Sequence, residues 1–112
     1  GYFPLWLAPV QVRVIPVSAS AGGEFAQTAI NELRSSDIRV DVDEREESLG
    51  KRIRAAELEK IPVVAVIGER EAQTRSVNVR RRGKKDQEVL PLTEFLEGIC
   101  REATVPDGAI ER

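Results

Sequence analysis

Apolar and polar residues alternate along two short segments in the first half of the chain, and a helical pattern lies between them. Residues 10–15 and 38–43 alternate with a period of two, which predicts two β-strands. Residues 24–34 place their apolar side chains on one stripe at helical spacing. This half of the chain therefore predicts a strand, a helix and a second strand.

The second half contains further elements with equally distinct patterns. Ser48 is a suitable N-cap for a helix whose buried stripe is Leu49, Ile53 and Ala56. The uninterrupted apolar run at 63–67 predicts a strand that is covered on both faces. The later elements expected are a polar turn at 68–75, a hairpin with strands at 77–82 and 88–90, and a final helix through 92–100.

The order of these elements predicts an α/β fold. Three parallel strands joined through helices, with the hairpin added as antiparallel edge strands, give a three-layer α/β/α sandwich around a five-stranded mixed sheet. One domain accounts for the 112 residues. We expect this domain at residues 10–103, between a junction at 1–9 that follows a missing upstream domain and a C-terminal tail at 104–112.

The segment 77–85 combines strand alternation with a run of positive charge. Its two valines point to one face of the sheet, whereas Asn78, Arg80 and Arg82 point to the other. A row of polar side chains at fixed spacing suits recognition of a nucleic acid. Taken alone, however, the segment slightly favours a solvated hairpin edge whose charges prevent aggregation.

Acidic and basic residues are nearly balanced, at 19 and 17, and the net charge is −2. A nucleic acid would therefore have to be met by a local basic patch rather than by the overall charge. A second basic cluster lies at 51–54, although Arg52 flanks the apolar stripe on the side opposite Lys51 and Arg54. The acidic residues between 41 and 47 have no recognisable ligand spacing, so we expect a solvated segment there.

The chain has one cysteine, Cys100, and no histidine. These counts exclude an intrachain disulfide, a zinc site built from cysteine and histidine, and catalysis by a histidine base. We therefore expect no catalytic or metal site in this chain, and core packing for Cys100. No apolar run is long enough to cross a membrane and no signal peptide pattern is present, so a cytoplasmic location is the default expectation.

Three segments of the chain resemble the threonyl-tRNA synthetases, which are class IIa aminoacyl-tRNA synthetases. They are FPLWLAPVQV at 3–12, DEREESLGKRIR at 43–54 and VNVRRRG at 77–83, and the likeness runs from about Phe3 to Cys100. The resemblance implies the C-terminal anticodon-binding domain of such a ligase. It further implies tRNA as a partner, a catalytic domain in the same parent chain, a homodimeric parent, and ATP, magnesium and zinc for the missing upstream domains only.

The resemblance also implies roles for individual residues. Anticodon contacts would fall on Arg80 and Glu71, and further contacts on Lys60 and Glu46, where the family commonly has arginine and asparagine. Threonine anticodons share a middle guanine, to which an arginine can offer two parallel hydrogen bonds. The residues expected to meet phosphates are Arg82, Lys84, Lys85, Lys51 and Arg54. Arg81 lies on the valine side of the strand, so we do not assign it to the RNA.

Three alternatives remain open at this point. The chain can be a free-standing RNA-binding or regulatory module of the same fold. It can also be the equivalent domain of a prolyl, histidyl or glycyl enzyme. The third alternative is a protein-binding module that uses an apolar patch at Leu5 and Trp6.

Overall fold

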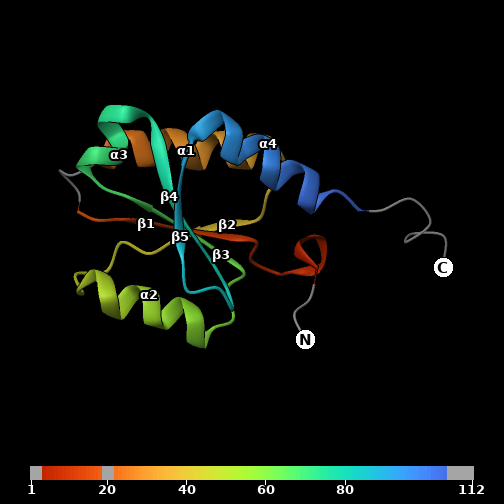
Figure 1. Ribbon diagram of the computed structural model, residues 1–112, viewed down its shortest axis with the longest axis horizontal. Coiled ribbons are helices and arrows are strands. Elements are labelled where there is room, and N and C mark those ends of the chain that lie inside the picture. Colours follow the sequence, from red (N-terminus) through yellow and green to blue (C-terminus); the bar gives the residue numbers. More distant parts are fainter. Residues whose placement is uncertain (1–3, 19–21, 106–112) are drawn as a thin grey trace.

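A five-stranded mixed sheet lies between helices in this protein, for which the computed structural model describes residues 4–18 and 22–105 (Figure 1). The elements in chain order are η1 (Leu5–Leu7), β1 (Val12–Pro16), α1 (Gly23–Ser35), β2 (Val40–Val42), α2 (Leu49–Leu58), β3 (Val63–Ile67), α3 (Glu69–Thr74), β4 (Ser76–Arg81), β5 (Gln87–Pro91) and α4 (Leu92–Ala103). None of the helices in the described ranges has the length and apolar character needed to span a bilayer.

The sheet has the strand order β2-β1-β3-β4-β5. Strand β1 pairs in parallel with β2 and β3, and the pairs β3–β4 and β4–β5 are antiparallel. Helix α2 alone covers one face, and α1 and α4 cover the other (Figure 1). The predicted three-layer sandwich is confirmed. However, β4 lies between β3 and β5, so the interpretation of its basic segment as a sheet edge is wrong.

Two apolar cores lie on the two faces of the sheet. The larger one packs α1 and α4 against the sheet and contains Val14, Phe25, Leu33, Phe95 and Ile99. The smaller one lies under α2 and consists of Ile15, Ala56, Ile61, Val64 and Val66. Because alternate residues of β3 enter the two cores, the whole strand is apolar, as its sequence predicts. Cys100 packs at the margin of the larger core, as expected.

Residues just before β1 pack closely against the domain. Leu5 in η1 is buried, and its carbonyl oxygen accepts a hydrogen bond of 3.0 Å from the Gln11 amide. Arg39 donates to the carbonyl oxygens of Ala8 and Trp6. Leu5 is thus part of the core, which argues against an apolar docking patch there. Residues 1–3 of the expected junction and 106–112 of the expected tail lie outside the described residues.

Two local predictions are wrong. Residues 68–75 contain the short helix α3 rather than only a turn, and no residue of this helix is buried, so it has no apolar stripe to reveal it. The second strand covers only Val40–Val42, because α1 ends through Asp37 in the left-handed region at φ 62° and Ile38 is buried in the turn.

Candidate nucleic-acid interface

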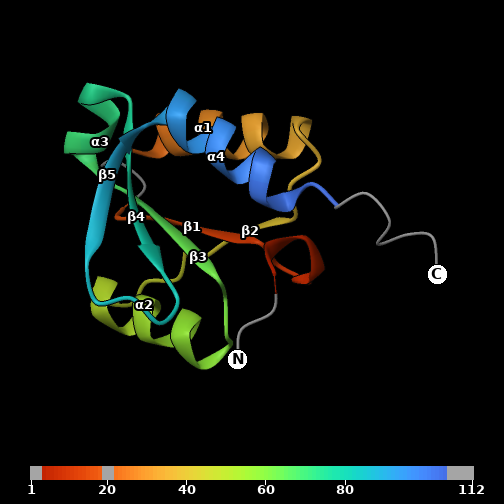
Figure 2. The same cartoon turned by 45° about the vertical axis from the view of Figure 1, so that its right-hand side comes forward.

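A cleft of about 510 Å³ separates α2 from the β4–β5 hairpin, whose turn lies beside the helix (Figure 2). The hairpin lines it with a continuous basic segment, Arg80 to Lys85, and α2 and β3 add Ile53, Glu57, Ile61 and Val64. Apart from Arg81, whose side chain is described below, the basic residues of this lining are Arg80, Arg82, Lys84 and Lys85, and Glu57 is the one acid in it. The local potential is therefore positive although the whole chain is slightly acidic.

Alternation along β4 places Arg80 in this cleft. Val77 and Val79 are buried in the larger core on the opposite face. Arg80 lies directly between Val64 of β3 and Gln87 of β5 in the sheet register. Its Nη2 donates a hydrogen bond of 2.8 Å to Gln87 Oε1, and its Nε is buried without a partner among the described residues. The Arg80 side chain is thus carried by a strand that is hydrogen-bonded to a neighbouring strand on each side.

Arg81 points to the other side of the sheet, as predicted. Its Nη1 and Nη2 donate to the two carboxylate oxygens of Glu102 in α4 at 2.8 and 2.7 Å. This two-pronged ion pair ties the end of β4 to α4. The Arg81 guanidinium is thus occupied by a structural contact, whereas Arg80 is paired with no acid in the part of the chain that the structure describes.

The turn of the hairpin carries the remaining cations of the cleft. Gly83 adopts φ 82°, a left-handed conformation that favours glycine, and the Lys84 N–H donates to the Arg81 carbonyl oxygen at 3.1 Å. The Arg82 N–H donates to Pro62 just before β3 at 2.9 Å, which fixes the base of the turn. Lys84 and Lys85 are exposed. The basic turn is thus held in a defined conformation.

Lys60 lies next to the same turn. Together with Arg82 and Lys84 it lines a neighbouring hollow of about 600 Å³ beside η1. Lys60 follows the end of α2 at φ 62°, where its N–H bonds to Glu57 and the next N–H, that of Ile61, bonds to Ala56. This is the arrangement in which glycine is usual. A lysine here is a strained residue at the rim of a basic surface.

Lys51 and Arg54 lie on the exposed surface of α2. Ser48 caps this helix by accepting a hydrogen bond of 3.2 Å from the Lys51 N–H, as predicted. The Lys51 ammonium group lies 3.5 Å from Glu47. Because both side chains of that pair are largely exposed, the ion pair adds little stability and leaves the lysine accessible.

Arg52 has a structural role that the sequence does not reveal. It is only 4% exposed, and its two terminal nitrogens donate to the carbonyl oxygens of Pro16, Asp43 and Val17 at 2.7, 3.2 and 3.0 Å. These carbonyls lie at the ends of β1 and β2. Arg52 therefore fastens the beginning of α2 to the sheet and is not part of a phosphate-binding ridge.

Arg13 fastens the other end of α2. Its guanidinium donates two hydrogen bonds to Asp41 at 2.9 Å and two to Glu59 at 3.0 and 2.8 Å. These bonds lower the pKa of Glu59 and raise that of Arg13. Asp43 is also buried, and the hydrogen bond from Arg45 lowers its pKa. The expectation of a solvated segment is therefore wrong at Asp43, whereas the side chain of Asp41 is 38% exposed.

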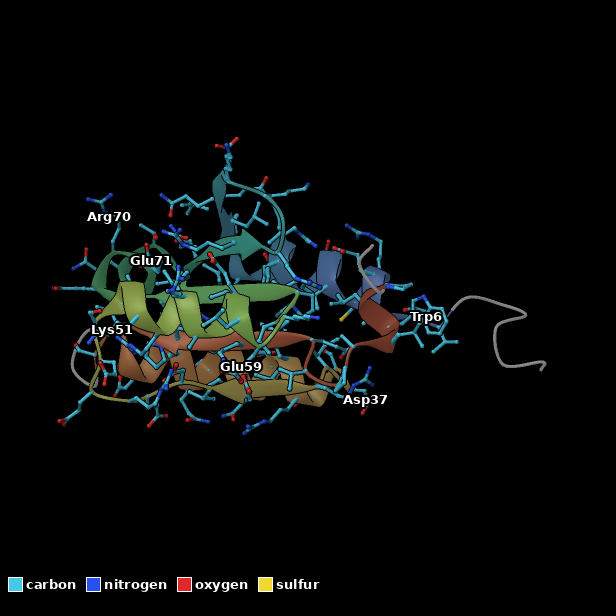
Figure 3. All side chains as sticks on the ribbon, turned by 90° about the horizontal axis from the view of Figure 1, so that it is seen from below. Trp6, Asp37, Lys51, Glu59, Arg70 and Glu71 are labelled. Atoms are coloured by element: carbon cyan, nitrogen blue, oxygen red, sulfur yellow. The ribbon has the colours of Figure 1, made fainter. Side chains whose placement is uncertain are left out.

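Glu71 and Glu46 are not part of the cleft. Glu71 is the third residue of α3, and its Oε1 accepts a hydrogen bond of 2.7 Å from the Gly68 N–H. Figure 3 shows Glu71 toward the same end of the molecule as Lys51. Glu46 is exposed and lines a different hollow, about 670 Å³ in volume, with Arg45 and Glu47.

The candidate contacts thus form two groups on this side of the molecule. The first, near the hairpin turn, consists of Arg80, Arg82, Lys84, Lys85 and Lys60. The second group, toward the other end of α2, contains Lys51 and the separate acids Glu46 and Glu71. Helix α2 is roughly 15 Å long at 1.5 Å per residue. Lys51 lies near the start of this helix and Lys60 follows its end, so an extended or looped strand is needed to reach both lysines.

Comparison with known proteins defines the class of this domain. The family described as "Anticodon binding domain" matches residues 11–102. The chain belongs to this family.

Within this family, the chain is similar to the corresponding part of threonine–tRNA ligases. It is 48% identical over 103 residues to the threonine–tRNA ligase of Halalkalibacterium halodurans, and 46% over 102 residues to that of Anoxybacillus flavithermus. These matches cover 92% and 91% of this chain but only 16% of each relative. The chain corresponds to the anticodon-binding domain of threonine–tRNA ligases and spans about a sixth of their length.

Solved structures agree with this assignment. The RNA binding domain of threonyl-tRNA synthetase from Cryptosporidium parvum Iowa II superimposes with a TM-score of 0.84 at 30% identity, over 91% of this chain and 26% of that one. A prolyl-tRNA synthetase from Cryptosporidium parvum shares the fold, with a TM-score of 0.75 at 23% identity over 91% of this chain and 23% of that one. The threonine family is therefore favoured over the prolyl alternative.

Proposed function

We propose that this domain binds the anticodon loop of threonine tRNA and so supports aminoacylation by a catalytic domain elsewhere in the same parent chain. The observation that carries the proposal is the geometry of Arg80. It stands on an interior strand at the floor of a basic cleft, and no acid among the described residues is paired with its guanidinium. A rigid, uncompensated guanidinium next to exposed lysines suits base reading combined with phosphate contact.

In this proposal Arg80 reads the middle guanine of the anticodon. The unpaired bases of an RNA loop expose their edges, and an arginine can donate two parallel hydrogen bonds to the O6 and N7 atoms of guanine. By analogy with DNA, such a contact discriminates by about 1–3 kcal/mol against a wrong base. Glu71 would accept from base N–H groups through Oε2, because its Oε1 already serves the Gly68 N–H.

The remaining candidates supply affinity rather than selectivity. Arg82, Lys84 and Lys85 would meet phosphates near the hairpin turn, and Lys51 and Arg54 would do so along α2. Lys60 stands at the rim of the first group, where it is placed for either a phosphate or a base. Glu46 is an acid in a separate hollow, so it is the weakest of the proposed anticodon contacts.

The parent protein would supply what this chain lacks. We infer a homodimeric threonine–tRNA ligase of the cytoplasm, whose upstream domains use ATP, magnesium and zinc. The residues at 4–9, which pack against β1 and α4, would then lead back to the catalytic domain. A natural free-standing RNA-binding module remains the second candidate, and the identity of the loop that is bound separates it from the first.

The experiment is binding of this chain to anticodon stem-loops of threonine tRNA that differ only in the middle base. We expect the wild type to prefer guanine, Arg80→Ala to lose about tenfold or more of that preference, and Lys85→Ala to weaken all loops alike. Arg81→Ala is the matched arginine control, since its side chain faces α4. If Arg80→Ala kept the wild-type preference, the proposed function would be wrong.

A further inference from the structure

The partner of the Arg80 guanidinium differs in charge from the partners of Arg13, Arg45 and Arg81. Arg13, Arg45 and Arg81 each bond to carboxylates. Arg80 donates instead to the neutral amide oxygen of Gln87, at 2.8 Å. No other hydrogen bond to this guanidinium occurs within residues 4–18 and 22–105. The hydrogen bond to Gln87 engages one of the five N–H groups of the guanidinium and does not neutralise its positive charge.

Sheet register fixes this contact. Arg80 and Gln87 are directly opposite each other on β4 and β5, two pairs beyond Asn78 and Val89. Cross-strand partners share one face of the sheet, here the face toward α2. Gln87 is exposed, and its amide oxygen accepts the hydrogen bond from Arg80.

We propose that Gln87 is a positioning residue that holds the Arg80 guanidinium ready for base reading; this inference rests on the function proposed above. An arginine side chain has large rotamer freedom, and immobilising such a side chain on binding costs about 0.5–1.5 kcal/mol. The Gln87 acceptor fixes one Nη2 hydrogen before RNA arrives. The second Nη2 hydrogen and the Nη1 group stay available for a base.

A neutral acceptor is better suited to this task than a carboxylate. An acid at position 87 would form a two-pronged ion pair like that of Arg81 with Glu102, which occupies both terminal nitrogens. It would also place a negative charge beside the basic turn that is proposed to meet phosphates. The amide orients the guanidinium while leaving both its charge and its outer donors for the nucleic acid.

The test separates preference from affinity. Gln87→Ala should lower the preference for the middle guanine about two- to tenfold, mainly by weakening the matched loop and leaving the mismatched loop nearly unchanged. Gln87→Glu should weaken both loops, because it neutralises the guanidinium. Gln27→Ala on the exposed surface of α1 is the matched control and should change neither. Urea unfolding of each variant checks that the fold is intact.

A double-mutant cycle decides the mechanism. In an Arg80→Ala background, Gln87→Ala should have no further effect on either loop, since a positioning residue acts only through its partner. An equal loss in both backgrounds would overturn the proposal by showing that Gln87 touches the RNA itself. No loss from Gln87→Ala, when Arg80→Ala does lose preference, would overturn it too. If Arg80→Ala itself changed nothing, the proposed function would fail first.

Discussion

Lys60 offers a test in which stability and RNA binding should move in opposite directions. It occupies the position after α2 at φ 62°, and a second residue, Asp37, stands at the same φ after α1. The hydrogen bonds also match, because the Asp37 N–H bonds to Arg34 and the Ile38 N–H to Leu33. Asp37 is labelled in Figure 3 at the far side from α3 and is an internal control.

The magnitude follows from backbone conformation. An L-residue in the left-handed helical region is disfavoured by roughly 1–2 kcal/mol, and glycine is not. Glycine also lowers the free energy of unfolding by about 0.4–1 kcal/mol, because it gives the unfolded chain greater conformational freedom. Lys60→Gly should therefore raise the free energy of unfolding by about 0.5–1 kcal/mol, which is a few degrees in Tm. Asp37→Gly should gain less, because aspartate tolerates this conformation better.

Urea and thermal unfolding measure the change in stability, and titration with the threonine anticodon stem-loop measures the change in RNA binding. Lys60→Gly should bind the loop more weakly, whereas Asp37→Gly should bind it as the wild type does. If Lys60→Gly failed to stabilise the domain while Asp37→Gly did, the strain argument would be refuted for that helix end. If it stabilised the domain without weakening the loop, Lys60 would not contact RNA.

Three further outcomes follow from the two arginines that anchor the ends of α2. Arg13→Met should lower the free energy of unfolding by about 1–3 kcal/mol, measured in urea at neutral pH, because charged hydrogen bonds to a buried group are lost. The bonds from Arg13 depress the pKa of Glu59. Their stabilisation is therefore present above the ordinary carboxyl pKa and is lost as the pH falls through the lowered pKa. Between pH 6 and 2 the midpoint of urea unfolding should decline less in Arg13→Met than in the wild type. Arg52→Ala should cost about 2–4 kcal/mol in the same assay, against less than about 0.5 kcal/mol for the exposed Arg54→Ala, and equal effects would contradict the anchoring role.

Local periodicity was sufficient for most of the architecture. The period-two alternation at 77–82 correctly separates Arg80 from Arg81, because side-chain direction in a strand is a local property. Strand order is not local: nothing in the segment itself indicates that β5 pairs beside it and makes β4 an interior strand. Helix α3 was missed because it buries no residue and so carries no periodic signal.

The anchoring residues were missed for a related reason. In the sequence, Arg13 is a polar member of an alternating strand, and its partners Asp41 and Glu59 lie 28 and 46 positions away. Arg52 looked like one more basic residue of an amphipathic helix. Only tertiary structure brings the strand-end carbonyls to its guanidinium. The basic turn, by contrast, is contiguous in sequence and was found directly.

The unequal division of the apolar core has a consequence for local opening. Helix α1 buries five apolar residues, whereas α2 buries a single one, Ala56, and relies on Arg52 and Arg13 at its two ends. Amide hydrogens of α2 should therefore exchange with solvent through smaller openings than those of α1. One wall of the cleft should thus detach at a lower free energy than α1 does. The width of the cleft can adapt to a loop of nucleotides while the β-sheet floor stays fixed.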